Sequence, residues 1–566
     1  MKLFSFKGGV KPNPNKSVST ALPIAQAPLV GRYIVPLHQS VGGTPRPIVS
    51  VGDYVLKGQR IGEADGWVSA AVHAPTSGTV VEIGPHIIPH PSGLPTDCVV
   101  IEADARDTWI ERTPFDIDHA SPDAIREYLR DMGIVGMGGA VFPSHVKLAV
   151  PKGKHIEQLI INGAECEPFI SCDDRLMREQ AAEVILGSAL FGQLVHAGQV
   201  LIGVEDNKPE AIAALKAAQE KLDAPVAVIT VPTIYPTGGA KELIRVLTGK
   251  EVPGSKRATD FGVQVFNVAT VQSAWRAITY GEPLISRIVT ISGAVGESRN
   301  WLVPIGMPIA DLVALAQPKP ESDGVIMGGP MMGFKVSTNA APVIKSTNSL
   351  IVNAPGLFPP KPQELPCIRC GACATACPQE LQPFELYWWS RANKFEPLEK
   401  YKLFDCIECG CCDYVCPSHI PLVNYFRFSK SEIQAAQREK QLADAARDRF
   451  EFREARAERE KREKAERLAK ANAARQAAEA AAAASTPTPA KPDEGVPDLS
   501  SHPNQASTPI AVDNHPVLDA SAKQAAIAAA VERARLKREQ HADKAGSTAP
   551  YFSYEPNLCL LNRLTS

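Results

Sequence analysis

The chain has 566 residues, which predicts about three to five domains at roughly 100 to 200 residues each. Its 60 Lys and Arg against 62 Asp and Glu give a formal net charge of −2, which excludes an overall basic field for binding nucleic acid or an anionic membrane. The chain contains no run of about 18 apolar residues, and its N-terminal segment lacks the pattern of a cleaved export signal. We therefore expect an unexported multidomain α/β and β protein that contacts a membrane only through partners.

Residues 1–115 predict a small β domain, because Val, Ile, Gly and Pro form short alternating stretches there. From Val49 the chain follows V-x-x-G-D-x-V-x-x-G-Q-x-I-G, and from Ala74 it follows A-P-x-S-G-x-V. These patterns resemble the barrel-sandwich hybrid of biotinyl and lipoyl carriers. Such carriers present a modified lysine at a hairpin tip, but no lysine lies between Ile61 and Ala74. We expect the hybrid fold without the carrier function.

Residues 116–286 predict a Rossmann-like α/β domain. Apolar runs typical of strands alternate with stretches typical of helices. Strands buried on both faces imply a mostly parallel sheet, and such sheets bind ligands at the loops that leave their strands. The strands are expected at 158–162, 200–204, 226–231 and 263–267, and the helices at 180–196, 209–222, 240–248 and 271–279.

Residues 287–354 return to short β signals with turns rich in Gly and Pro, which predict a small β module. The tail at 431–566 is dominated by Ala, Glu, Lys and Arg, and 453–550 contains no aromatic residue, so it cannot build a core. We expect a solvated helix over 432–484, then a linker rich in Pro and Ser, and a second short helix at 521–540. The tail would solubilise or tether the protein, or it would bind a partner.

Nine of the 13 cysteines lie between Cys367 and Cys416, and this clustering favours metal binding over disulfides. Eight of them form two runs that both spell C-x2-C-x2-C-x3-C-P. The first run is Cys367, Cys370, Cys373 and Cys377, and the second is Cys406, Cys409, Cys412 and Cys416.

This spacing is typical of two 4Fe–4S clusters held by a helical module at 355–430. Three thiolates of a run wrap one cluster, while the fourth completes the other cluster. Zinc is the alternative, but zinc does not require a third C-x2-C step and a closing proline in two matching runs. We expect Cys411 to be a packed free thiol, and the two clusters to relay single electrons. The predicted sets are Cys367, Cys370, Cys373 and Cys416 for one cluster, and Cys406, Cys409, Cys412 and Cys377 for the other.

A flavin is a natural electron source for such a relay, because it accepts a hydride and releases electrons singly. The α/β domain contains one candidate loop, GMGGAVFPSHVK at 136–147. Its glycines would let backbone N–H groups approach a phosphate or a flat ring, and Lys147 would add a positive charge. Alone this signal is weak, because glycine-rich turns are common.

Four further segments follow the glycine loop: INGAECEP at 161–168, DDR at 173–175, YPTGGAK at 235–241 and FNVAT at 266–270. In this order, upstream of the double cysteine run, they closely resemble the RnfC (RsxC) family of the Rnf (Rsx) ion-translocating ferredoxin:NAD oxidoreductase complexes. They resemble the flavin subunit of respiratory NADH dehydrogenase more distantly. The resemblance covers about residues 1–430 and an Ala-, Lys- and Arg-rich tail.

The resemblance implies FMN in the α/β domain, NAD(H) stacked on it, and a small ubiquitin-like (SLBB) module at 287–354. Hydride transfer would then depend on positioning, without a general acid or base. The implied partners are membrane-embedded and cluster-bearing subunits of the Rnf complex, at the cytoplasmic face of a bacterial inner membrane. By the same resemblance, Gly136, Gly138 and Lys147 would cradle FMN, Asn162, Glu165 and Asn267 would bond its polar edge, and Phe142 and Glu167 would contact NAD(H).

The sequence departs from the flavin-subunit pattern at several positions. Val141 replaces a glycine, Ala164 replaces an aspartate, and Gly239 and Ala240 replace two acidic residues. Glu165 and Glu167 therefore have an alternative role as capped or paired carboxylates in a turn. Two alternative functions also stay open: a soluble flavin-dependent corrinoid reductase, and a non-catalytic adaptor that only docks a cluster-bearing arm.

Overall fold

A computed structural model describes residues 2–151, 153–360 and 362–483. The predicted linker and the predicted second helix at 521–540 lie outside these residues. The chain divides into two units, Met1–Ala457 and Glu458–Ser566, and all the sites below belong to the first. No helix in the described ranges is both long enough and apolar enough to cross a lipid bilayer.

The N-terminal domain is built from two small antiparallel sheets around a buried core that includes Tyr33, Val99 and Ile101. This confirms the predicted β domain. One sheet has the order β2-β8-β7-β4, with β2 at Arg32–Pro36, β8 at Pro95–Ala103, β7 at Gly78–Ile87 and β4 at Tyr54–Val55. The other has the order β3-β5-β6, with β3 at Arg46–Pro47, β5 at Arg60–Glu63 and β6 at Val72–His73, and the short helix α1 spans Ser17–Thr20.

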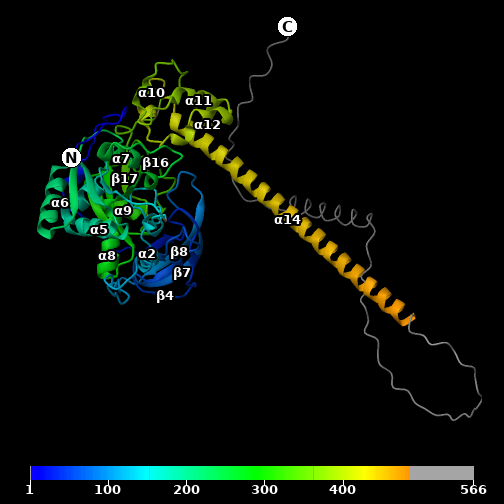
Figure 1. Ribbon diagram of the computed structural model, residues 1–566. Helices are drawn as coiled ribbons and strands as arrows, with labels where there is room; N and C mark the ends of the chain where they lie inside the picture. The colour runs from blue at the N-terminus through cyan, green and yellow to red at the C-terminus, as the bar shows by residue number, and fades with distance from the viewer. Residues whose placement is uncertain (1, 152, 361, 484–566) are drawn as a thin grey trace, which may run out of the picture. The chain divides into compact units, whose positions relative to one another are not determined.

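The second domain contains a four-stranded sheet whose strands are all parallel, as predicted. Its order is β11-β10-β9-β12, with β11 at Val226–Val231, β10 at Gln199–Glu205, β9 at Gln158–Gly163 and β12 at Val263–Asn267. Packed against one face are α4 (Cys172–Glu179), α5 (Ala181–Leu194), α6 (Pro209–Leu222) and α8 (Val268–Tyr280), while α7 (Ala240–Thr248) covers the other (Figure 1). Helices α2 (Pro122–Asp131) and α3 (Ser144–Leu148) precede the sheet, and η1 (Ala258–Phe261) precedes β12.

The order of these strands creates a crevice between β9 and β12. The chain passes from β9 to β10 on one side of the sheet, whereas β12 pairs with the opposite edge of β9. Connections that diverge in this way open a ligand crevice at the carboxyl ends of the strands. Asn162 and Asn267 end these two strands in register, so their side chains meet at this point.

A mixed six-stranded sheet forms the third module and confirms the predicted β character of 287–354. Its order is β1-β14-β13-β17-β15-β16, and β1 comes from the N-terminal segment of the chain. The assignment of this module to the small ubiquitin-like class stays a prediction. The elements are β1 (Ala25–Gln26), β14 (Arg299–Pro304), β13 (Ser286–Gly293), β17 (Ser349–Asn353), β15 (Gly324–Met327), β16 (Phe334–Lys335) and α9 (Ile309–Leu315).

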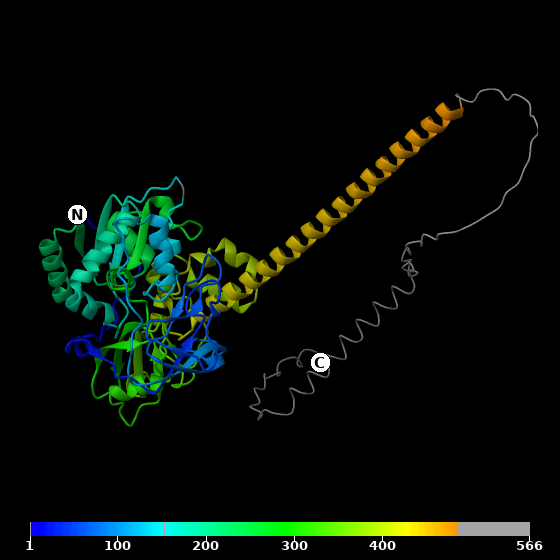
Figure 2. The ribbon, with the colours of Figure 1, turned by 90° about the horizontal axis from the view of Figure 1, so that it is seen from below.

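Cysteine-bearing loops and short helices follow, and they end in one long helix, α14, which Figures 1 and 2 both draw without a break. The predicted helix at 432–484 is confirmed as far as Ala483, but it begins ten residues earlier, at Leu422, because Phe426 is buried in the core of the cysteine module. The other elements are α10 (Ala372–Ala376), α11 (Pro383–Arg391), α12 (Phe395–Lys400), η2 (Leu403–Asp405) and α13 (Cys411–Tyr414).

Lys345 joins the first three modules. Its buried ammonium donates to the carbonyl of Ala71 in the β domain at 3.1 Å and to the carbonyl of Gly133 in the α/β domain at 2.8 Å. Burial lowers the pKa of Lys345 to about 7. A charged Lys345 therefore costs folding free energy at and below neutral pH.

We expect K345M to flatten the pH dependence of stability between pH 7 and pH 10. In this window the unfolded chain keeps the lysine proton and the folded chain releases it, so the free energy of unfolding of the natural protein rises with pH. Urea unfolding followed by circular dichroism at both pH values measures the effect. An equal rise in the midpoints of the natural protein and K345M would contradict the assignment.

Candidate functional site

The two cysteine runs surround two cavities, and each cavity draws its cysteines from both runs. The last cysteine of each run lines the cavity formed by the first three cysteines of the other run. All eight thiols are free of disulfide bonds. The first cavity is lined by Cys367, Cys370, Cys373 and Cys416, and the second by Cys377, Cys406, Cys409 and Cys412.

The loops around the two cavities share one backbone conformation. Arg369 and Gly371 in the first loop, and Glu408 and Gly410 in the second, have φ values between +55° and +78°. These left-handed residues bend each loop tightly, so that its sulfurs converge on one centre. The backbone N–H of Glu408 also donates to Cys406 Sγ at 3.4 Å, a contact that stabilises a thiolate. Four converging thiolates are the donor set that a 4Fe–4S cluster uses, so the residues fit that group.

The glycine loop lies at the mouth of the crevice between β9 and β12. It is closed by the N–H of Gly136, which donates to the carbonyl of Phe142 at 2.9 Å, and Gly138 lies directly over the end of β12. Gly139 has φ +104° and faces open space, a conformation that requires glycine. Val141 has φ +41°, which is strained for a β-branched residue. The glycine of the flavin-subunit pattern at this position therefore has a conformational reason.

The two asparagines at the strand ends hold neighbouring loops. Asn162 donates to the carbonyl of Gly238 at 2.8 Å and accepts from the N–H of Ala164 at 3.1 Å. Asn267 donates to Asp173 Oδ2 at 2.6 Å, and its Oδ1 accepts from the first turn of α8. Both side chains are thus occupied in shaping the crevice.

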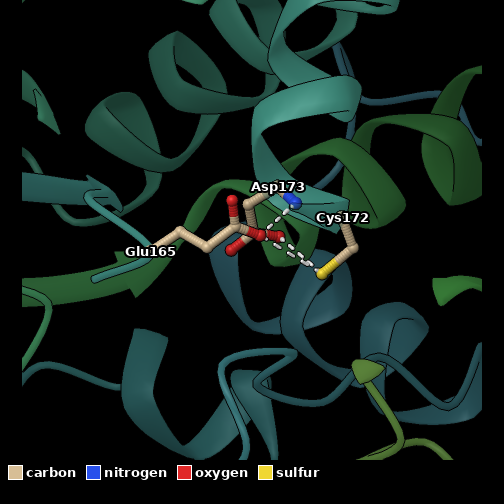
Figure 3. A group of neighbouring side chains, drawn as sticks. All are labelled: Glu165, Cys172 and Asp173. Atoms are coloured by element: carbon tan, nitrogen blue, oxygen red, sulfur yellow. Dashed lines mark hydrogen bonds between the residues drawn. The ribbon is translucent and has the colours of Figure 1, made fainter. Parts of the chain in front are cut away.

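Glu165 caps helix α4, as Figure 3 shows. Its Oε1 accepts from the N–H of Asp173 at 2.7 Å, and its Oε2 accepts from the N–H of Asp174 at 3.2 Å. Cys172 completes the group, whose ligand atoms lie within 4.8 Å of one another. Burial and the neighbouring Glu165 carboxylate raise the pKa of Asp173 to about 7. This cap starts α4 at Cys172, ahead of the helix expected from 180, because the capping group lies outside the helix itself.

Lys147 is a cation with few partners. Its ammonium donates to the carbonyl of Val265 and lies 4.6 Å from the centre of the Phe266 ring. Burial lowers the pKa of Lys147 to about 8. Among the described residues no carboxylate forms an ion pair with it. The position therefore suits an anionic ligand such as a phosphate.

Glu167 and Tyr235 connect the α/β domain to its neighbours. Glu167 Oε1 accepts from the N–H groups of Met331 at 2.7 Å and Met332 at 3.1 Å, in the six-stranded module. The buried Tyr235 hydroxyl donates to the carbonyl of Cys409 at 2.6 Å. These contacts hold the second cysteine loop against the turn that follows β9.

The same junction has an apolar core. Val10, Tyr235, Cys409 and Cys411 are buried together, and Cys166 packs against them. Cys411 also lines the second cavity beside the four predicted ligands. Its expected role as a packed thiol stays a prediction.

The crevice fits FMN through its backbone more than through the predicted side chains, since Asn162, Asn267 and Glu165 bond to the protein itself. Within the described residues, the N–H groups of Gly138 and Gly139 have no acceptor. An open glycine backbone beside a buried cation is the kind of cradle that holds a phosphate and a flat ring.

The sequence reasoning missed several residues of this site. Gly139 and Tyr235 lie inside the quoted motifs, so their positions offered a signal. Lys16 and Lys208 lie outside every motif, and both reach the turn after β9. No pattern of spacing in the sequence marks them.

A parallel α/β domain with this crevice, joined to loops that gather two sets of four thiols, defines an iron–sulfur flavoprotein architecture. Three family models match the chain accordingly. The RnfC Barrel sandwich hybrid domain matches residues 4–106, the Nuo51 FMN-binding domain matches 129–276, and the 4Fe-4S dicluster domain matches 366–420.

The chain is 48% identical over 457 residues to the RnfC subunit of the ion-translocating oxidoreductase complex of Pseudomonas aeruginosa, which covers 80% of this chain and 59% of that protein. It is 43% identical over 460 residues to the protein of the same name from Haemophilus influenzae, covering 81% and 69%. A crystal structure of NAD+-reducing NiFe hydrogenase in the H2-reduced state aligns with a TM-score of 0.41 at 18% identity, over 58% of this chain and 69% of that one.

The chain belongs to the RnfC family of ion-translocating oxidoreductase complexes. The matched part spans 59% of the length of the Pseudomonas aeruginosa relative.

Proposed function

We propose that the chain is the peripheral NADH-, FMN- and iron–sulfur-binding subunit of a membrane-bound complex that couples electron transfer between NAD(H) and ferredoxin or other acceptors to ion translocation. Its partners are membrane-embedded and cluster-bearing subunits, at the cytoplasmic face of a bacterial inner membrane. The observation that carries the proposal is the direct contact between the turn after β9 and the loop of Cys409. Bound FMN would supply the step from hydride to single electrons.

The proposed cofactor sites follow from this contact. The loop of Gly136, Gly138 and Gly139 and the ammonium of Lys147 would hold FMN, with the ends of β9 and β12 at its polar edge. Phe142 would stack on the nicotinamide nucleotide at the end of the same loop, and Glu167 would contact it. The eight cysteines lining the two cavities would bind two 4Fe–4S clusters.

We propose that the cluster in the second cavity accepts electrons first. Its loop touches the α/β domain through Tyr235 and Met331, and a Cβ at Gly410 would lie 2.7 Å from the carbonyl of Met331. In the first loop Cys370 and Ile368 are exposed instead. The first cavity would therefore deliver electrons to a partner.

Y235F is expected to slow electron transfer from reduced flavin to the clusters by about fivefold, because the hydrogen bond that holds the Cys409 loop contributes about 1 kcal/mol. Anaerobic stopped-flow absorbance after NADH addition separates flavin reduction from cluster reduction. The matched control is Y128F, which removes a hydroxyl that donates to the carbonyl of Ala277 at 3.0 Å on helix α8. The idea fails if both variants transfer electrons at the rate of the natural protein.

Anaerobic EPR of the purified protein titrated with NADH tests the function as a whole. Two interacting cluster signals that appear together with reduced flavin are the expected result. Protein that contains iron and flavin but is not reduced by NADH would favour a non-catalytic adaptor. Reduction of cobalamin by protein that does not co-purify with membrane subunits would favour a corrinoid reductase.

A further inference from the structure

Two buried lysines converge on the turn that follows β9. Lys208 is 1% exposed, and its ammonium donates to the carbonyl of Ala164 at 2.6 Å and to Glu205 Oε2 at 3.0 Å. Lys16 donates to the carbonyl of Glu165, the next residue along the turn. Two consecutive peptide carbonyls therefore point toward two ammonium groups.

The ammonium groups lie close to each other, on the same side of the turn. Burial lowers the pKa of Lys16, and the charge of Lys208 lowers it further. Lys16 Nζ also lies 3.9 Å from Glu165 Oε2. Buried cations need strong acceptors, and these carbonyls and the carboxylates of Glu165 and Glu205 provide them.

The planarity of the peptide bond converts this into a statement about N–H groups. In a trans peptide the N–H points opposite to the preceding carbonyl. The N–H groups of Glu165 and Cys166 therefore point away from the lysines. In the part of the chain that the structure describes, neither N–H has an acceptor, whereas the N–H of Ala164 is already bonded to Asn162.

We propose that Lys16 and Lys208 are positioning residues that aim the N–H groups of Glu165 and Cys166 at the polar edge of FMN. This rests on the proposed function, because it assumes that FMN occupies the crevice. The carboxylate of Glu165 caps α4, so Glu165 would serve the flavin through its backbone. Two N–H donors backed by two cations would favour the reduced, electron-rich ring over the oxidised ring.

The test measures FMN affinity by fluorescence quenching and the flavin midpoint potential by spectroelectrochemistry. We expect K16M to weaken binding of reduced FMN about tenfold more than binding of oxidised FMN, which lowers the two-electron potential by about 30 mV. K16R keeps the charge and the donor and should restore both values. The double variant E205Q/K208M removes the second ammonium without leaving an unpaired carboxylate, and the same direction of change is expected.

The matched control is K250M, because Lys250 also donates to a backbone carbonyl, of Phe261 at 2.8 Å, and pairs with Glu157. Unchanged affinity and potential in both K16M and E205Q/K208M would overturn the proposal, and so would an equal change in K250M. If E205Q/K208M does not fold, K16M against K16R decides. Failure of the natural protein to bind FMN would refute the proposed function itself, and it is seen before any variant is made.

Discussion

The C377S variant is expected to lose the iron of the second cavity and keep the iron of the first. Cys377 belongs to the first run in sequence, but its sulfur lines the cavity formed by the second run. Iron content should fall from about eight to about four atoms per chain, since each cubane needs four thiolate ligands. Iron and labile sulfide analysis of anaerobically purified protein measures it, and the reciprocal variant C416S should lose the other half.

Double variants distinguish crossed from contiguous ligand sets. Under the crossed arrangement, C377S/C409S removes two ligands of one cluster and should retain about half of the iron, whereas C377S/C370S should lose nearly all of it. Contiguous sets predict the reverse order. Zinc in place of iron and sulfide would refute the cluster assignment.

G139A is expected to weaken FMN binding by tenfold or more. Gly139 has φ +104°, which costs an alanine about 1 to 3 kcal/mol, and the added methyl group would enter the open space in front of the loop. The loop can escape this strain only by leaving the conformation that exposes its N–H groups. Titration of apoprotein with FMN, followed by flavin fluorescence, measures the affinity.

The control for G139A is G52A. Gly52 has φ +98° and also faces open space, but it lies in the N-terminal β domain. Both variants carry a similar backbone cost, so a comparable loss of thermal stability is expected in each. A loss of FMN affinity of the same size in G52A, or no loss in G139A, would remove the glycine loop from the flavin site.

The amino-acid sequence was sufficient where the chemistry is local. The spacing of Cys367, Cys370 and Cys373 reflects how three neighbouring thiolates reach one centre, and their crossed partner Cys416 follows from the same rule. The apolar runs in the α/β domain predict its four strands because strands buried on both faces must be apolar along their whole length. Helices 209–222 and 240–248 were predicted with the boundaries that the structure has.

Only the tertiary structure decided what each polar group of the crevice bonds to. Glu165 was predicted to meet FMN through its side chain, but its carboxylate caps a helix that begins seven residues later in the chain. Lys16 and Lys208 come from segments far apart in sequence and converge on one turn. The physical reason is that hydrogen-bond partners depend on distance in space, and a sequence pattern records only distance along the chain. Which donors remain free for a ligand is therefore known only after every buried polar group has found its partner.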